Sequence, residues 1–352
     1  MAVELILRIA LTLLIGVVSG VVAKTVGMPL PWMLGPMIGT TVVAAAGFDL
    51  RFPAKLLYVA FPVVGVMLGS RITSEMMAQA PQWITTFVLL VPFVVAACGL
   101  SYVFYRKIGG FDAATAYYSA MPGGLNDMVI LGGAAGGDER RIALAHAARI
   151  LCVIGFVALF FGAVLGVRSS AAPGQWLAVT QIDWHDAAWL AGAAVLGLPL
   201  GKVLRLPAPY MLGPMIVSAV VHVAGFVSIP PPDLLVIGAQ VVLGVRIGVR
   251  FRGVPVRDIV RDLRLGAVSS IMMISVALGF AWVNAILSDI ELSQAFLAFS
   301  PGGFVEMSLL ALAMGQEVAY VSISHVLRIM LVIFGAPIAA RVIRIGNGSQ
   351  SK

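Results

Sequence analysis

Apolar stretches separated by short polar segments follow one another along almost the whole chain. Most are close to the roughly 20 residues that a helix needs to cross the hydrocarbon core of a bilayer. The stretches 83–105 and 265–288 contain no charged residue and are the clearest candidates. The predicted spans are 5–23, 30–48, 54–70, 79–104, 112–136, 141–167, 187–204, 208–228, 233–247, 265–288, 293–315 and 318–340. The pattern predicts an all-α polytopic membrane protein whose surrounding partner is the lipid bilayer.

The second half of the chain repeats the first. Pro-Trp-Met-Leu-Gly-Pro-Met-Ile at 31–38 returns as Pro-Tyr-Met-Leu-Gly-Pro-Met-Ile at 209–216, an offset of 178 residues. Further matches in the same order pair 46–48 with 224–226, 68–72 with 243–247, 122–124 with 301–303, and 146–149 with 325–328. Matched blocks in one order at a nearly constant offset indicate an internal duplication.

The duplication predicts how the chain is divided. We expect a first membrane repeat at 1–168, an external linker at 169–186, a second membrane repeat at 187–345 and a cytoplasmic tail at 346–352. The first 25 residues resemble a signal peptide, but Lys24 aligns with Lys202 of the second repeat. This segment is therefore expected to be the first helix of a repeat and not a cleaved leader.

Basic residues fall on opposite sides of the two repeats. The loop 49–55 contains two basic residues, and its partner 227–233 contains none. Conversely, the segment 246–264 contains six arginines, and its partner 71–80 contains one. Because cytoplasmic loops are enriched in Lys and Arg, we expect two inverted repeats of about five transmembrane helices each. Both termini are then cytoplasmic, in a multi-pass protein of the bacterial inner membrane.

Composition adds a further constraint. The chain is 60% hydrophobic and only 11% charged, whereas soluble proteins carry about 25% charged residues. It also contains 38 Gly and 19 Pro. Spanning helices tolerate such breakers only where other groups satisfy the freed backbone. These counts indicate interrupted helices that line a cavity, as in secondary transporters with inverted repeats.

The most informative breaks are two Pro-Gly-Gly sequences, expected to divide broken helical hairpins at 112–136 and 293–315. The residues after such a break start a half-helix, whose free N–H groups and positive dipole end can hold an anion. An acid follows each break at the same place, Asp127 in the first repeat and Glu306 in the second. The candidate substrate or ion sites also include Gly123, Gly124, Asn126, Gly302 and Gly303, with breaks at Pro122 and Pro301. The alternative is a tight interfacial loop whose acids face water.

A histidine precedes an arginine by three residues in both repeats. The pairs are His146 with Arg149 and His325 with Arg328. This spacing puts each pair on one helix face, and an arginine at membrane depth is costly unless it is paired. The acids that follow the breaks are its natural partners. One interpretation is a structural ion pair that fixes each hairpin. The other is a charged centre in which arginine and histidine bind an anionic substrate while the acid exchanges a proton or sodium ion.

The repeated block at 31–38 contains Pro36, which corresponds to Pro214 in the copy. Both prolines are expected to bend a helix one turn after its start. The neighbouring Gly35 and Gly213 allow close approach of helices. Packing is one role for this block, and lining a transport pathway is the other.

Two other classes of site are not expected. Asp258 and Asp262 interrupt the arginines of 246–264, and few aromatic residues accompany them, so direct nucleic-acid binding is not predicted. The chain has four histidines and two cysteines, without close pairs of histidines. We therefore expect no metal site, no cofactor, no catalytic residue and no enzymatic activity.

The chain resembles the bacterial AbrB-type inner-membrane family, also called the AbrB duplication family. The resemblance rests on the duplicated Pro-Met-Leu-Gly-rich and Pro-Gly-Gly blocks and covers about residues 7–167 and 187–345. It implies a polytopic membrane protein linked to regulation of gene expression. The family is also labelled ammonia monooxygenase. The residues do not support that label, because each repeated histidine lies beside an arginine that would repel a metal cation.

Two hypotheses for the function follow. The first is a secondary transporter that moves a small anionic solute coupled to protons or sodium. The second is a membrane-embedded regulator that senses a ligand and alters gene expression indirectly. The sequence names neither the substrate nor the oligomeric state, and a homo-oligomer is left open.

Overall fold

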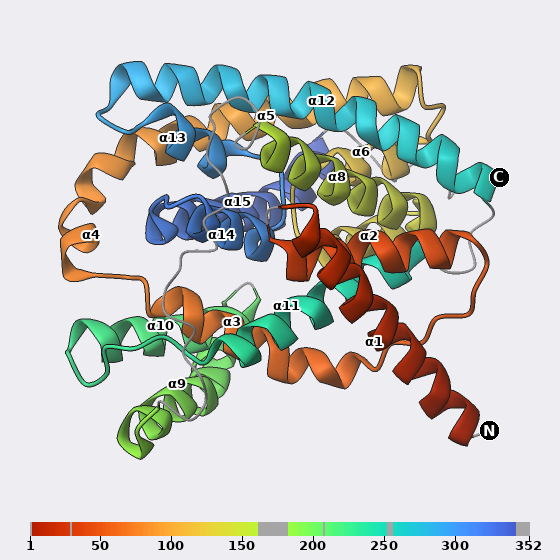
Figure 1. Ribbon diagram of the computed structural model, residues 1–352. Helices are drawn as coiled ribbons and strands as arrows, with labels where there is room; N and C mark the ends of the chain where they lie inside the picture. The colour runs from red at the N-terminus through yellow and green to blue at the C-terminus, as the bar shows by residue number, and fades with distance from the viewer. Residues whose placement is uncertain (1, 29, 161–181, 207, 252–255, 343–352) are drawn as a thin grey trace. The chain divides into compact units, whose positions relative to one another are not determined.

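The computed structural model of the chain describes residues 2–28, 30–160, 182–206, 208–251 and 256–342 (Figure 1). All secondary structure within these ranges is helical, so the all-α prediction is confirmed. Most of the expected linker 169–186 and the whole expected tail 346–352 lie outside the described residues.

The helices follow the predicted apolar stretches. They are α1 (Ala2–Thr25), α2 (Pro31–Ala45), η1 (Ala54–Leu56), α3 (Leu57–Gly69), α4 (Ser74–Ala78), η2 (Ala80–Trp83), α5 (Ile84–Lys107), α6 (Ala113–Ala120), α7 (Leu125–Ala134), α8 (Glu139–Leu159), α9 (Trp184–Val203), α10 (Pro209–Val223), α11 (Asp233–Gly248), η5 (Val249–Phe251), α12 (Val256–Leu287), α13 (Leu292–Phe299), α14 (Phe304–Ala313) and α15 (Val318–Val342). Within the described ranges, four segments are long and apolar enough to cross a bilayer, namely Glu4–Thr25, Ala80–Lys107, Val260–Leu287 and Val318–Val342. This bears out a membrane-type helical protein.

Two compact units divide the chain. The first unit consists of Met1–Ala78, Phe161–Pro255 and Leu312–Ala319, and the second unit of Gln79–Phe160, Val256–Ala311 and Tyr320–Lys352. The first unit contains α1–α4 together with α9–α11. The second unit contains α5–α8 together with α12, α13, most of α14 and α15. Each unit is therefore built from corresponding helices of both sequence repeats.

In the first unit, helices from different repeats pack against each other through glycines. Helix α11 lies against α2, where a side chain at Gly244 would collide with the backbone carbonyl of Met33. Helix α3 lies against α10 in the same way, and a side chain at Gly65 would collide with the carbonyl of Met211. The same contact is thus made twice, with the roles of the repeats exchanged. This exchange supports the duplication.

Each of these glycines is followed four residues later by another, Gly69 on α3 and Gly248 on α11. A side chain at Gly69 would collide with the Met215 carbonyl, and one at Gly248 with the Thr40 hydroxyl. Two small residues at this spacing let helix backbones approach closely within a membrane. The glycine count noted in the composition is therefore partly explained by helix packing.

The glycine contacts alter one detail of the sequence match. The blocks 68–72 and 243–247 align with an offset of 175 and pair Gly69 with Gly244. In the structure, Gly65 and Gly244 make the equivalent contact, at an offset of 179. This value agrees with the offset of the Pro-Gly-Gly blocks. The difference of four residues is about one helical turn, so the repeated Leu-Gly-x-Arg-Ile block is displaced by one turn between the repeats.

Helices α2 and α10 start in the same unusual way. Both begin with a proline in the first turn, Pro31 in α2 and Pro209 in α10. The preceding residues, Leu30 and Ala208, have φ values of 45° and 51°. Residues other than glycine rarely adopt this left-handed conformation. Its recurrence at the same place in both repeats shows that the two helix starts share one backbone geometry.

The internal prolines Pro36 and Pro214 are buried in α2 and α10. A side chain at Gly197 of α9 would meet the backbone of Pro214, and one at Gly244 of α11 would approach Cβ of Pro36 at 3.1 Å. Gly213 in turn faces the Gly197 carbonyl. The described contacts of this repeated block are therefore packing contacts between helices.

In the second unit, buried side chains connect helices from the two repeats by hydrogen bonds. The hydroxyls of Ser101 on α5 and Ser269 on α12 are 2.5 Å apart. Thr86 of α5 donates to Oδ1 of Asn284 on α12 at 3.0 Å, and its hydroxyl is 2.8 Å from that of Tyr320 on α15. Such bonds satisfy polar groups that would be costly in an apolar setting.

The Pro-Gly-Gly sequences interrupt the helices of the second unit where expected, between α6 and α7 and between α13 and α14. Helix α7 folds back along α6. The amide of Asp138, just beyond α7, donates to Oγ1 of Thr115 near the start of α6 at 2.8 Å. In addition, a Cβ at Gly132 would lie 3.2 Å from Cβ of Tyr118. The first interrupted segment is therefore a hairpin whose two ends lie next to each other.

The packing of α11 on α2 yields a test on a single helix. Gly244→Ala is expected to destabilise the fold by about 1–3 kcal/mol, because the added methyl collides with rigid backbone. The matched control is Gly238→Ala on the same helix, where nothing lies within 4 Å. This control should be neutral or slightly stabilising, because alanine favours helix formation. Thermal unfolding of the detergent-purified variants measures the contrast, and equal melting temperatures would contradict the packing.

The cap of α6 predicts a pH dependence. The Asp112 carboxylate accepts hydrogen bonds from the backbone N–H of Thr115 at 2.9 Å and from its hydroxyl. Partial burial raises the pKa of Asp112, but these hydrogen bonds lower it more, so the pKa lies below its ordinary value. The cap therefore stabilises the fold above about pH 4, and this contribution is lost as the pH falls through the folded pKa.

We expect the native chain to melt at a higher temperature than Asp112→Asn at neutral pH. The gap should shrink below about pH 4. Unfolding followed by tryptophan fluorescence across this pH range gives the measurement. A gap that is constant with pH would show that the charge of the cap contributes nothing.

Candidate functional site

The first candidate cluster lies where the hairpin of α6 and α7 is interrupted. Arg149 on α8 is 5% exposed. Its Nη1 donates to the carbonyl oxygen of Met121 at 3.0 Å and more weakly to that of Ser119 at 3.5 Å. Helix α6 ends at Ala120, so these carbonyls belong to a helix end, where hydrogen bonding within the helix stops. The guanidinium supplies the missing donors.

The second cluster has the same construction. Arg328 on α15 is 1% exposed. Its Nη1 donates to the carbonyl oxygen of Ser300, and its Nη2 donates to that of Gly302 at 2.7 Å. Ser300 follows α13 directly and occupies the position of Met121 in the first repeat, at the offset of 179 residues. Each arginine thus binds the interruption of its own repeat, and we call this contact the arginine clamp.

Both clamps belong to the second unit. The interruption that Arg149 holds reaches the helix of Arg328, because a side chain at Gly123 would approach Val332 of α15 at 2.9 Å. The described hydrogen-bond acceptors of both arginines are neutral carbonyls. Two arginine side chains are therefore buried in the second unit, where charge is expensive.

The histidines of the two repeats are fully buried but bonded differently. Nδ1 of His146 is 2.9 Å from the carbonyl oxygen of Ile142 on its own helix. Nε2 of His325 is 2.9 Å from the carbonyl oxygen of Leu297 on α13. A carbonyl only accepts hydrogen bonds, so these nitrogens carry the protons. Nδ1 of His325 has no hydrogen-bond partner. The sequence pairs these residues as copies, whereas the structure gives them different contacts.

The acids after the breaks lie at the starts of their own half-helices. Asp127 is in the first turn of α7, and a side chain at Gly124 would collide with its carboxylate. Glu306 lies in the same place in α14, against Gly303. A carboxylate at this position interacts with the free N–H groups and the positive dipole end of its helix. The acids therefore occupy the position that the sequence suggested for a bound anion.

The two acids are more exposed to solvent than the two buried arginines. Asp127 is exposed and Glu306 is half-buried. An ion pair between Asp127 and Arg149 was the expectation from sequence, but the described hydrogen bonds of Arg149 go to carbonyls. The side chain of Asn126 lies outside the described part of the structure. Asp127 therefore lies against the start of its own helix, and no described hydrogen bond joins it to Arg149.

The glycines and prolines of the breaks make close contacts. Pro122 and Pro301 are buried. A side chain at Gly123 would approach Val332 of α15 at 2.9 Å, and one at Gly302 would approach Met307 at 2.6 Å. Both breaks are therefore packed into the second unit. Bulkier residues at these positions would have to displace their neighbours.

Sequence reasoning missed several buried polar groups beside the clamps. Ser119 and Ser300 are at most 1% exposed, and their hydroxyls have no hydrogen-bond partner. Nε of Arg149 and Nε of Arg328 likewise have none. Buried polar groups are normally satisfied, so these four atoms are candidates for contact with a bound ligand. The signal available in the sequence was a serine one to three residues before each Pro-Gly-Gly.

The donors beside the clamps suit an anion better than a metal. Guanidinium and hydroxyl groups donate hydrogen bonds to carboxylate, phosphate or similar oxygens. Within the described ranges, no three His, Cys, Asp or Glu side chains come together as a metal site would need. The described contacts show each arginine holding one helix end, and the remaining donors are of the kind that small anions accept.

The family model described as "Transition state regulatory protein AbrB" matches residues 32–344. A protein of Escherichia coli strain K12 named "Putative regulator AbrB" is 27% identical over 321 residues, covering 90% of this chain and 91% of that protein. The "Uncharacterized protein YhjN" of Bacillus subtilis strain 168 is 25% identical over 359 residues, covering 96% and 93%. Because the family model spans both Pro-Gly-Gly breaks and both arginine clamps, the chain belongs to the AbrB family.

Proposed function

We propose that this protein is a secondary transporter of the inner membrane that moves a small anionic solute coupled to protons or sodium. The observation that carries the proposal is the pair of buried arginine clamps. Two buried guanidinium groups retain Nε–H donors and stand beside unpartnered serine hydroxyls. A bound anion would satisfy these donors and compensate the charge.

The helix ends at the clamps also support transport. In secondary transporters, interrupted helices place backbone groups around a substrate site near the middle of the membrane. Here each clamp joins an interrupted helix of one hairpin to the next long helix of the same repeat. We infer that the two repeats are inverted and that both termini are cytoplasmic, because the basic loops change sides between them.

We assign the coupling ion to Asp127 and Glu306. Each carboxylate lies against the glycine that precedes its half-helix. Protonation, or binding of sodium, would weaken the interaction of the acid with that helix start. The half-helix would then be released to change its conformation. The histidines belong to the same centre in this proposal, and no enzymatic activity is inferred.

The serines allow ligand binding to be separated from structural support. We expect at least one member of a panel of small carboxylates, phosphate and sulfate to raise the melting temperature of the purified protein. A ligand at about 100 times its dissociation constant stabilises the fold by about 2.7 kcal/mol. In Ser119→Ala with Ser300→Ala, basal stability should change little, while the ligand-induced shift should fall.

The matched control is Ser101→Ala, whose hydroxyl is 2.5 Å from that of Ser269. This variant should lose basal stability and keep the ligand-induced shift. An unchanged shift in the double serine variant would remove the clamps from the ligand site.

Coupling can be tested in proteoliposomes with the anion found by that screen. Asp127→Asn combined with Glu306→Gln should abolish uptake driven by a proton or sodium gradient, while the thermal shift by the anion persists. The amides keep the shape of the side chains and cannot exchange a proton at neutral pH. Gradient-driven uptake at the native rate in this variant would show that the acids are not the coupling groups.

A second function is favoured by the name of a relative. The protein of Escherichia coli is named a regulator, so a membrane-embedded regulator that senses the same anion is the alternative. We infer no direct contact with nucleic acid, so its effect on expression would be indirect. Replacement of the basic connector around 246–264 would then abolish the effect on expression while anion binding survives. If the protein is a transporter, its activity should depend on the acids and the arginine clamps and not on this connector.

A further inference from the structure

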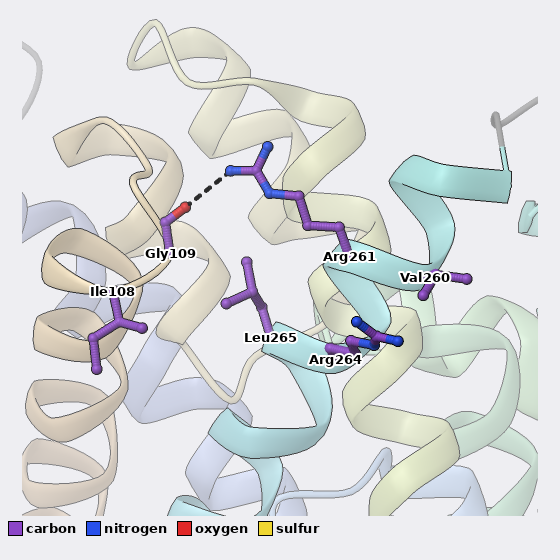
Figure 2. A pocket seen from close by; sticks show the side chains of 6 residues that line it. All are labelled: Ile108, Gly109, Val260, Arg261, Arg264 and Leu265. Carbon is purple, nitrogen blue, oxygen red and sulfur yellow. Dashed lines mark hydrogen bonds between the residues drawn. The ribbon is translucent and has the colours of Figure 1, made fainter.

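A pocket with polar and apolar lining residues, distinct from the arginine clamps, lies at one end of α5 and α12 (Figure 2). It has a volume of about 540 Å³ and is lined by Ile108, Gly109, Val260, Arg261, Arg264 and Leu265. One candidate membrane span ends at Lys107, and another begins at Val260. The pocket therefore lies at the boundary of two spans, the level at which lipid headgroups meet a membrane protein.

The polar half of the pocket consists of two arginines on consecutive turns of α12. Arg261 donates to the carbonyl oxygen of Gly109 at 3.4 Å, and Figure 2 shows its guanidinium reaching toward that loop. Arg264 is exposed, and the exposed Lys107 ends α5 nearby. Asp262, the acid next to Arg261, is 5% exposed and so lies away from solvent, and the side chain of Asp258 lies outside the described part of the structure. The charged side chains that line the pocket in the described part of the structure are therefore positive.

The apolar half continues onto the surface of the spans. Ile108 is 72% exposed and Val260 is 40% exposed. Val268 and Ile271 follow Arg264 on the same face of α12, because they lie four and seven residues further along. They are 45% and 61% exposed. An apolar strip thus leads from the pocket along the membrane-spanning part of the helix.

We propose that this pocket binds an anionic phospholipid. Arg261 and Arg264 contact the phosphate, the glycerol region fills the pocket, and an acyl chain lies along Val268 and Ile271. A free phosphate would use the arginines but would gain nothing from Ile108, Val260 and the apolar strip. Lipid phosphate and guanidinium are complementary in charge and geometry. This site is separate from the arginine clamps and does not depend on the proposed transport.

The test compares lipids added to the full-length protein in detergent. Phosphatidylglycerol should raise the melting temperature more than phosphatidylcholine, and inorganic phosphate should have little effect. In Arg261→Gln with Arg264→Gln, the apparent affinity for phosphatidylglycerol should fall by roughly tenfold or more, since each cation near an anionic headgroup contributes measurably. The melting temperature in phosphatidylcholine should stay close to that of the native chain.

The matched control is Arg71→Gln, which removes an exposed arginine of the first unit and should leave the preference for phosphatidylglycerol intact. Retention of that preference in the double variant would overturn the proposal. Equal stabilisation by inorganic phosphate and phosphatidylglycerol would also overturn it, because the pocket would then be an anion site and not a lipid site. Val268→Gln with Ile271→Gln should weaken the lipid effect and leave any effect of phosphate unchanged.

Discussion

The structure depends on satisfying backbone carbonyls where a helix is interrupted inside an apolar environment. Each Pro-Gly-Gly sequence ends a helix and leaves acceptors that water cannot reach. The chain solves the problem with an arginine from the following long helix, and it uses the same solution in both repeats. A neutral donor could have satisfied the carbonyls. Use of a guanidinium adds positive charge, and this charge gives the second unit its affinity for an anion in our proposal.

The two units use different means of holding helices from different repeats together. In the first unit, Gly65 and Gly244 bring backbones into direct contact. Such packing leaves no room for side-chain rearrangement. In the second unit, serines, Thr86, Asn284 and the arginines form hydrogen bonds across helices. The first unit also has such a bond, from the Ser218 hydroxyl to the Val66 carbonyl, so the two units differ in the balance of the two means.

Much of the local architecture could be predicted from the sequence. The positions of Pro122 and Pro301 fixed the helix breaks, and the absence of other charges near Arg149 and Arg328 placed these residues on apolar helices. These predictions succeed because proline and buried charge have strong local consequences. The family resemblance was also correct.

Features that depend on tertiary contacts could not be predicted. The sequence supplied an acid near each arginine but could not show that Asp127 turns back onto Gly124, because both arrangements satisfy the carboxylate. The contacts pair Gly244 with Gly65, one helical turn away from the Gly69 that the sequence match assigns to it. The match between blocks 68–72 and 243–247 concealed this difference. The grouping of helices from both repeats in each unit arises from packing between distant segments. The hydrophobic pattern of a single helix does not reveal which distant helix it packs against.

Because each unit contains helices of both repeats, neither unit can be complete until the second repeat has been synthesised. A ribosome completes α1–α8 before it makes any helix of the second repeat, yet neither unit holds its full set of helices at that time. Faces of α2 and α3 that later pack against α11 and α10 are exposed to lipid or to other proteins during this interval. The long-range contacts also slow folding, because distant segments must meet before they stabilise each other. The first half of the chain therefore cannot complete either unit until the second half has been made.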